Sequence, residues 1–362
     1  MRKELITHVA PGATFSYLAP RMKWDLAYTL DYRYYSRNSQ NSDIAHTAQA
    51  TGSITLLQRL LFLDLSNRYQ RVPLDISRDT TLESLTFNQS DQNQAQVSPY
   101  ILLDLGGRTS LKTGYRYSDT RYWNSAGIDK LDQSGFLEVN RQQTERLSLS
   151  AGYTYVNSTA TVNSFDRHDL SAGFRYEYAD KSFLYGQVGN SWQSYDSGND
   201  MSNLFWNAGI TRDFTVAVAT VESSEQYTED PLTAATRQRT YLGKLDIPLQ
   251  RGAIGLSSSY SEYVIAATGR MDRRRLAFDG SWRYELIDRL TASLAGTVER
   301  VNQRTTADYP YRLSGTAGVN YLFNHGISMA VNYTYVIYRF GLDDASGSKE
   351  INRAIVEVRK SF

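Results

Sequence analysis

The sequence contains no cysteine, and this absence excludes several kinds of structure and chemistry. Without thiols, the chain of 362 residues has no disulfide, no thiolate metal site and no covalently attached c-type haem of its own. It also lacks any run of about 18 apolar residues, so the sequence predicts no membrane-spanning helix. The net charge is only +1, from 39 Lys and Arg against 38 Asp and Glu, which gives no support for a nucleic-acid partner.

Recognisable catalytic and metal-binding motifs are missing as well. No Gly-x-Ser-x-Gly nucleophile motif or phosphate-binding loop occurs, and none of the four His residues has a neighbour at metal-ligand spacing. His168, beside Asp166 and Asp169, is the best hydrolase candidate, but the sequence predicts no enzyme, no cofactor and no metal site. The longest polar loop carries acidic residues whose spacing matches no known calcium cage, and we expect them to be solvated: Asp75, Asp79, Glu83 and Asp91.

The segment from Met22 to Tyr34 shows what the chain contains instead. Its even positions are apolar or aromatic, and its odd positions are mostly charged or small. This period of two predicts a strand with one apolar and one wet face. The charged residues of the wet face would not fit a packed sandwich core, and the apolar face ends in tyrosines suited to a membrane–water boundary. We therefore interpret the segment as one strand of a transmembrane β-barrel.

The same pattern repeats over residues 1–362, which predicts a single domain. About 19 such segments alternate with short and long connections, each near the roughly 9–11 residues that a tilted strand needs to cross a bilayer. Because bacterial barrels have even strand numbers, we expect an antiparallel barrel of about 18–20 strands: 20 if a strand lies upstream of this sequence, 18 if the first segment is not a membrane strand. Short turns would be periplasmic and long loops extracellular. Aromatic residues support two membrane interfaces, with one group at the long-loop ends (Tyr34, Tyr69, Tyr117, Tyr155, Tyr260 and Tyr335) and one at the short-turn ends (Tyr178, Trp282, Tyr284, Tyr321 and Phe323).

Charged residues that alternate with the apolar, lipid-facing positions along the strands are expected to line the barrel interior. We name them the lumen set: Lys23, Asp25, Asp31, Arg33, Asp64, Arg68, Lys112, Arg116, Asp169, Arg175, Glu177, Lys244, Asp246, Arg275, Asp279, Arg283, Arg312, Glu357 and Arg359. Both signs are interleaved, which suits a hydrated wall and disfavours strong ion selectivity. The run from Arg273 to Arg275 is a separate hypothesis: it could bind lipopolysaccharide phosphates or draw anions to the mouth, although a solvated strand end is the simpler interpretation.

Two prolines interrupt the strand pattern, and the motifs around them carry a family resemblance. Pro11 and Pro99 fall inside predicted strands, where we expect β-bulges. The segments 7–12 (THVAPG) and 96–100 (QVSPY) resemble recurring pieces of an uncharacterised outer-membrane β-barrel family that is associated with exopolysaccharide loci and the PEP-CTERM/exosortase system. Members of that family carry a strand upstream of the first motif. The resemblance implies export of a polysaccharide across the outer membrane, with no catalytic residues to carry over.

The sequence and the resemblance together predict a passive, porin-like conduit in the bacterial outer membrane, for exopolysaccharide export. Two alternatives remain open at this stage: a barrel sheath around a multihaem cytochrome, and a general small-solute porin. Expected partners are outer-membrane lipids and lipopolysaccharide, the outer-membrane assembly machinery, and either periplasmic export proteins or the cytochrome. The terminal Phe362 fits the aromatic assembly signal of such barrels. No apolar signal-peptide core occurs at Met1 to Glu4, so an exported protein is expected to be longer than this sequence.

Overall fold

Strands account for nearly all of the regular structure. A computed structural model describes residues 6–35, 43–76, 89–123, 126–198, 200–303, 310–339 and 348–360. The strands are β1 (Ile6–Val9), β2 (Gly12–Ala19), β3 (Met22–Tyr35), β4 (Asp43–Leu57), β5 (Leu61–Pro73), β6 (Gln89–Gly106), β7 (Thr109–Tyr122), β8 (Lys130–Gln142), β9 (Leu147–Ala160), β10 (Phe165–Ala179), β11 (Ser182–Tyr195), β12 (Asp200–Asp213), β13 (Val218–Thr228), β14 (Thr236–Leu249), β15 (Gly252–Ile265), β16 (Arg270–Ile287), β17 (Leu290–Gln303), β18 (Tyr311–Leu322), β19 (Ile327–Arg339) and β20 (Lys349–Lys360). A short 3₁₀ turn, η1 (Asn324–Gly326), joins β18 to β19. Among the described residues, no helix has the length and apolar character needed to span a bilayer.

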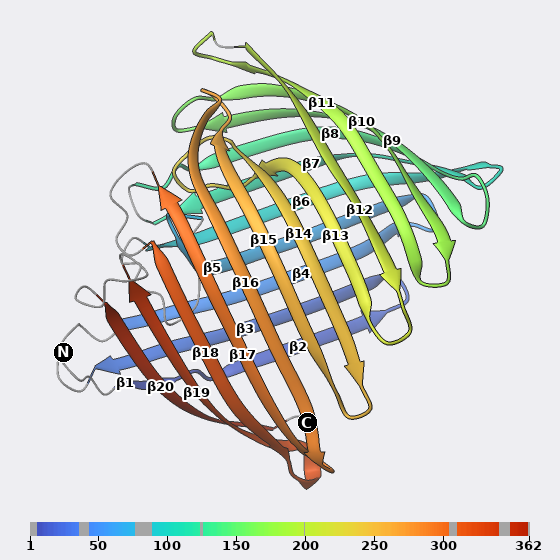
Figure 1. Ribbon diagram of the computed structural model, residues 1–362. Helices are drawn as coiled ribbons and strands as arrows, with labels where there is room; N and C mark the ends of the chain where they lie inside the picture. The colour runs from blue at the N-terminus through green and yellow to red at the C-terminus, as the bar shows by residue number, and fades with distance from the viewer. Residues whose placement is uncertain are drawn as a thin grey trace.

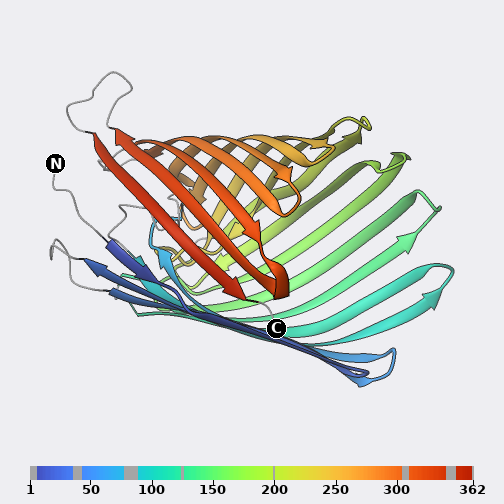
Figure 2. The same ribbon diagram turned by 90° about the horizontal axis from the view of Figure 1, so that it is seen from below.

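All strands belong to one antiparallel sheet that curls into a barrel-like wall (Figures 1 and 2). From β3 onward, each strand pairs with the next along the chain. Both β1 and β2 pair with β3, so they form one interrupted arm. The 20 strand segments therefore make 19 arms. The prediction of an all-β antiparallel barrel of about this size is confirmed.

The first and last arms leave the ring of pairings open. No pairing joins β20 to β1 or β2 among the described residues, and in Figure 2 the N- and C-terminal strands border the same unpaired side of the wall. Both arms run from the long-loop end to the short-turn end. Direct pairing of these two arms would therefore be parallel, unlike every pairing within the sheet, because neighbouring antiparallel strands alternate in direction.

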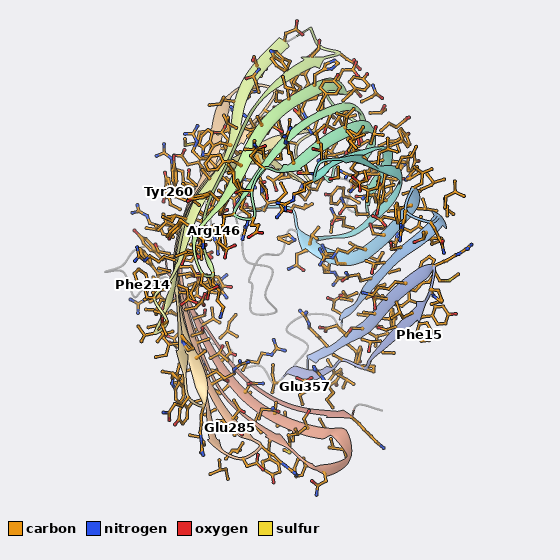
Figure 3. All side chains as sticks on the ribbon, turned by 90° about the vertical axis from the view of Figure 1, so that its right-hand side faces the viewer. Phe15, Arg146, Phe214, Tyr260, Glu285 and Glu357 are labelled. Carbon is orange, nitrogen blue, oxygen red and sulfur yellow. The ribbon has the colours of Figure 1, made fainter. Side chains whose placement is uncertain are left out.

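Pairing registers divide the side chains between two faces. Cross-strand partners lie on the same face of a sheet; Asp25, for example, pairs with Thr51. In Figure 3, Phe15 and Phe214 lie on the outer side of the wall, whereas Glu357 lies on its inner side. Large apolar residues of the outer face are exposed, with Phe15 at 57%. In water this would be unfavourable, but it suits contact with lipid.

The two strand prolines do not form the predicted bulges. Register is unchanged across Pro11, from Val9↔Tyr32 to Gly12↔Thr29. Pro99 likewise remains in step with its neighbours in β5 and β7. Each proline removes one N–H donor and interrupts the ladder without adding a residue. The bulge prediction is therefore wrong, because a missing donor can be tolerated without a change in residue count.

Candidate functional site

The connection between β13 and β14 enters the hollow of the barrel at its long-loop end. We name residues 229–235 the tip segment. Its contacts reach strands that are not its neighbours in the sheet: β8, β10, β11 and β16. The side chains that it contacts on these strands all belong to the inner face of the sheet according to the pairing registers, so the tip segment folds inward and lies across part of the mouth.

On one side, the tip segment is held by an ion pair to β8. The Nζ atom of Lys130 lies 2.7 Å from Oε1 of Glu229 and donates to the backbone carbonyl of Asp230 at 2.8 Å. The hydroxyl of Tyr122 also donates to Glu229 at 2.9 Å. Next to them, the amide of Ile128 donates to the carbonyl of Pro231. The Lys130 side chain is only 3% exposed, so its positive charge depends on these partners.

Asp230 connects the tip segment to β16. Its carboxylate accepts hydrogen bonds from the Leu232 amide and the Thr236 hydroxyl, both at 2.9 Å. It also lies 3.9 Å from the guanidinium of Arg273, which forms a 2.8 Å ion pair with Asp75 from the β5–β6 connection. Burial raises the pKa of Asp230, and the nearby charge of Arg273 opposes this rise. The cluster thus joins three separate parts of the chain through buried charges.

An apolar cluster anchors the other side of the tip segment. Phe165 of β10 and Tyr195 of β11 pack with Ala235 and Ala266, and all four are buried. Next to this cluster, the ring of Tyr227 lies 4.2 Å from the guanidinium of Arg167. The tip segment is therefore fixed by apolar packing as well as by charge.

Every residue of the lumen set lies on one face of the sheet according to the pairing registers. This face also carries Lys130 and Arg273, which contact the tip segment, so it faces the hollow. Several of its charges pair with a residue two positions along the same strand, for example Lys23 with Asp25 at 2.9 Å and Lys244 with Asp246 at 2.7 Å. The wall therefore presents many charges of both signs, partly neutralised locally.

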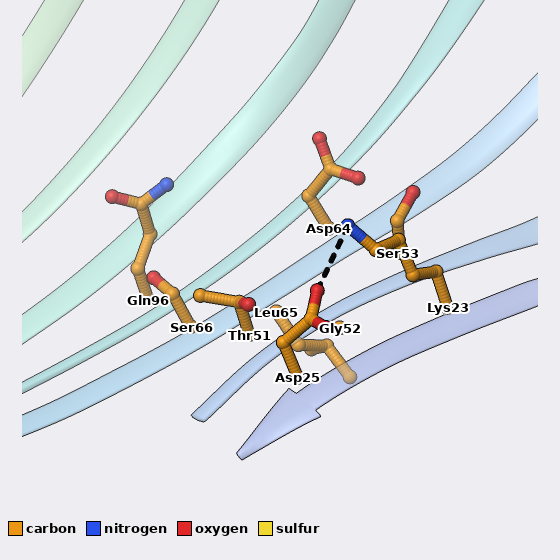
Figure 4. Close-up of a pocket in the computed structure, with 9 residues that line it drawn as sticks. All are labelled: Lys23, Asp25, Thr51, Gly52, Ser53, Asp64, Leu65, Ser66 and Gln96. Carbon is orange, nitrogen blue, oxygen red and sulfur yellow. Dashed lines mark ion pairs between the residues drawn. The ribbon is translucent and has the colours of Figure 1, made fainter. Parts of the chain in front are cut away.

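A polar hollow of about 320 Å³ lies on the inner wall (Figure 4). Its lining comes from β3 to β6: Lys23, Asp25, Thr51, Gly52, Ser53, Asp64, Leu65, Ser66 and Gln96. The Lys23–Asp25 ion pair lies within it. Because its groups are small and of mixed charge, the hollow offers hydrogen bonds without a preference for one sign.

Aromatic residues also reach the inner wall, on a strand whose facing the sequence pattern left ambiguous. In β11, Phe183 and Tyr185 share a face with Arg175, while Leu184 lies on the opposite face. The Arg175 guanidinium lies 3.6 Å from the Phe183 ring centre, and Tyr185 donates to Glu222. Apolar residues occur at both parities of β11 because aromatic rings there pack against lumen charges.

The run from Arg273 to Arg275 and the residue His168 are two other candidate sites that the sequence suggested. The pleat divides the arginine run: Arg273 and Arg275 face inward, while Arg274 lies on the other face, 3.5 Å from Glu262. His168 contacts the hydroxyl of Tyr153 at 2.8 Å on the outer face, with no serine in the contact.

Two acidic residues that the sequence placed in the longest polar loop serve as ion-pair partners: Asp75, in the β5–β6 connection, and Asp91, within β6. Asp91 pairs with Arg71 at 2.9 Å, as Asp75 does with Arg273, while Asp79 and Glu83 lie outside the described residues, as does Phe362. Within the described parts of the chain, no group of three His, Cys, Asp or Glu side chains is placed to hold a metal ion.

Sequence reasoning did not find the tip segment. Glu229 and Asp230 precede Pro231 in a polar connection, which looks like any solvated loop in the sequence. The available signal was Lys130, whose parity places it on the inner face at a strand end, where an unpartnered lysine would be costly to bury. Its partner, 99 positions away, could not be identified from local pattern.

Comparison with known proteins supports the fold and the location. No family model matches the sequence, and no curated protein does, so the resemblance to the exopolysaccharide-associated family stays a prediction. Solved structures do match. The FrpB iron transporter from Neisseria meningitidis has a TM-score of 0.64 at 11% identity, covering 98% of this chain and 73% of that one. The ferric enterobactin receptor PfeA from Pseudomonas aeruginosa has a TM-score of 0.60 at 11% identity, covering 98% and 70%.

A third match corrects the expected function. The ferric-catecholate import receptor Fiu from E. coli K12 has a TM-score of 0.55 at 10% identity, covering 98% of this chain and 74% of that one. All three are transporters or receptors, so the prediction of a porin-like conduit for exopolysaccharide is wrong, and neither the cytochrome sheath nor the general porin is supported. The error arose because alternating strands predict a barrel whatever its cargo. The chain shares the fold of outer-membrane transport barrels and is a protein of the bacterial outer membrane, with short periplasmic turns and longer extracellular loops.

Proposed function

We propose that this protein is an outer-membrane receptor that takes up a bulky anionic solute, of the class of ferric chelates, from the extracellular side. The tip segment is the observation that carries this proposal. It lies across part of the extracellular mouth and is held there by Lys130 and Arg273. A receptor that closes until its ligand arrives needs such a contact, whereas a passive conduit does not.

Charge at the mouth indicates the class of ligand. In the closed arrangement, the carboxylates of Glu229 and Asp230 face two basic side chains of the wall, Lys130 and Arg273. An anionic ligand can replace those carboxylates as the partner of the same bases, because charge-assisted hydrogen bonds of similar geometry would form. The tip segment would then be released as the ligand binds. Catecholate chelates of iron are anionic, and two of the similar solved structures are receptors for such chelates.

A binding experiment tests this competition with two variants, one expected to lower the affinity for the ligand and one expected to raise it. The reconstituted protein is titrated with a ferric tris-catecholate, and intrinsic tryptophan fluorescence is followed; a neutral ferric trihydroxamate is the comparison ligand. Lys130→Met removes a wall base and is expected to weaken catecholate binding about tenfold or more, the worth of one charge-assisted hydrogen bond. Glu229→Gln combined with Asp230→Asn removes the competing acids and is expected to strengthen it.

Lys244→Met is the matched control, because Lys244 lies on the same face, near the periplasmic end, with Asp246 as its partner. It should leave the affinity unchanged. Equal affinity for both ligands, or no gain when the two tip acids are neutralised, would contradict the proposal. A large steady conductance of the wild-type protein in a planar bilayer would show instead that the tip segment does not close the mouth.

A further inference from the structure

The periplasmic turns share a feature that the transport function does not require. In four of them, a basic residue has a left-handed backbone: Arg59 (φ 63°), Arg108 (φ 65°, after two glycines that also have positive φ), Lys181 (φ 52°) and Arg289 (φ 69°). We name these the basic turn residues. Each of the four turns also carries a register shift between its two strands. The same hairpin design thus recurs around the periplasmic rim.

A left-handed backbone normally favours glycine or asparagine, because a side chain clashes with the following carbonyl group. Lysine and arginine gain nothing from this conformation. Their recurrence in four periplasmic turns therefore indicates that the positive charge itself is useful there. Further basic residues lie at three other periplasmic turns: Arg21, Arg146 and Arg251.

Apolar residues beside these charges indicate where the turns lie. Leu57 is 54% exposed next to Arg59, Leu105 is 57% exposed near Arg108, and Ile287 is 59% exposed near Arg289. Such residues at the tips of turns would be unfavourable in the aqueous periplasm. They suit the boundary between acyl chains and headgroups, from which long basic side chains reach outward to the phosphates.

Local carboxylates leave much of this charge available. Among the described residues, Arg59, Arg108 and Lys181 form no ion pair with a carboxylate. Arg289 has Asp288 at 3.6 Å, but the two side chains are 46% and 90% exposed, so water screens their attraction. Arg289 also donates to the side-chain carbonyl of Asn324.

We propose that the basic turn residues form a ring of binding sites for anionic phospholipid headgroups in the periplasmic leaflet of the outer membrane. The turns of Arg59, Arg108 and Arg289 insert an apolar residue at the acyl boundary, and all four turns place an ammonium or guanidinium group at the level of a lipid phosphate. A ring of this kind fixes the depth and tilt of the barrel, because every short turn contacts the same plane of the bilayer.

Lipid retention by the full chain tests this proposal. The protein is reconstituted in bilayers of phosphatidylethanolamine and phosphatidylglycerol, and the lipids retained after delipidation are counted by native mass spectrometry. The test variant replaces all four residues with asparagine (Arg59→Asn, Arg108→Asn, Lys181→Asn and Arg289→Asn). Asparagine accepts the left-handed backbone, so the turns should persist. Heat-modifiable migration on a gel confirms folding of each variant.

Among the lipids that the wild-type protein retains, the fraction of phosphatidylglycerol should exceed its fraction in the bilayer. For the asparagine variant, the two fractions should be equal. Each basic group near an anionic surface contributes about fivefold in affinity. A matched variant with Arg59→Lys, Arg108→Lys and Arg289→Lys keeps the charge and should keep the enrichment. Equal phosphatidylglycerol enrichment in the wild-type protein and the asparagine variant would overturn the proposal and leave a periplasmic protein as the partner of these charges.

Discussion

Replacement of Asp230 by asparagine should loosen the tip segment without disturbing the barrel wall. Asp230 is 1% exposed and accepts two hydrogen bonds, from the Leu232 amide and the Thr236 hydroxyl, both at 2.9 Å. It also lies 3.9 Å from Arg273. Asparagine has nearly the same shape, but its NH₂ group replaces one acceptor oxygen and carries no charge.

The size of this effect follows from those contacts. One buried donor loses its acceptor, and the other keeps a neutral acceptor in place of a charged one. Losses of this kind cost about 2 kcal/mol, which corresponds to a change of about 30-fold in the closing equilibrium of the tip segment. Arg273 retains Asp75 at 2.8 Å, so β16 is not left with an uncompensated charge.

The absence of native cysteine makes labelling a clean assay. A single cysteine is introduced as Ala235→Cys; Ala235 is 7% exposed and is covered while the tip segment is closed. Its rate of reaction with a maleimide reports the open population when closing is faster than labelling. We expect Asp230→Asn to increase this rate about 30-fold. A second cysteine variant, Val216→Cys, at a turn residue that is 72% exposed, should react at the same rate in both backgrounds. An unchanged rate at position 235 would refute the reasoning.

Two further predictions concern packing and closure. Gly252→Ala should destabilise the barrel by about 1–3 kcal/mol in a thermal unfolding assay, since its added Cβ would clash with the backbone oxygen of Arg283. Gly315→Ala is the control and should be neutral, because its added Cβ meets nothing within 4 Å. Paired variants such as Ala13→Cys with Ala354→Cys should not form a disulfide, because β20 does not pair with β2 among the described residues and a disulfide needs Cα atoms within about 7 Å; a disulfide would show direct parallel pairing.

Local sequence pattern was enough to predict the wall of the barrel. The alternation from Met22 to Tyr34 predicts β3 with its correct facing, because side chains on a strand point to opposite faces at every step. Prolines were less informative: Pro11 and Pro99 mark an interruption of hydrogen bonding, but pattern alone does not show whether a residue has been added. In β11, aromatic residues occur at both odd and even positions, so the pattern did not show which side of the strand faces the hollow. That facing depends on a contact with Arg175 in the neighbouring strand.

The sequence by itself determined the class of protein: the period of two, the two groups of aromatic residues and the interleaved charges specify an antiparallel barrel in a membrane. Each of these signals arises from a residue and its near neighbours. Only the tertiary structure decided how the tip segment is held across part of the mouth, because Lys130 and Glu229 are 99 positions apart and Arg273 and Asp75 are 198 apart. Those pairs meet only once the sheet has curled, and the same curvature brings the basic periplasmic turns into one ring. A local pattern encodes the strand and its facing, whereas contacts across the hollow depend on the curvature of the whole sheet.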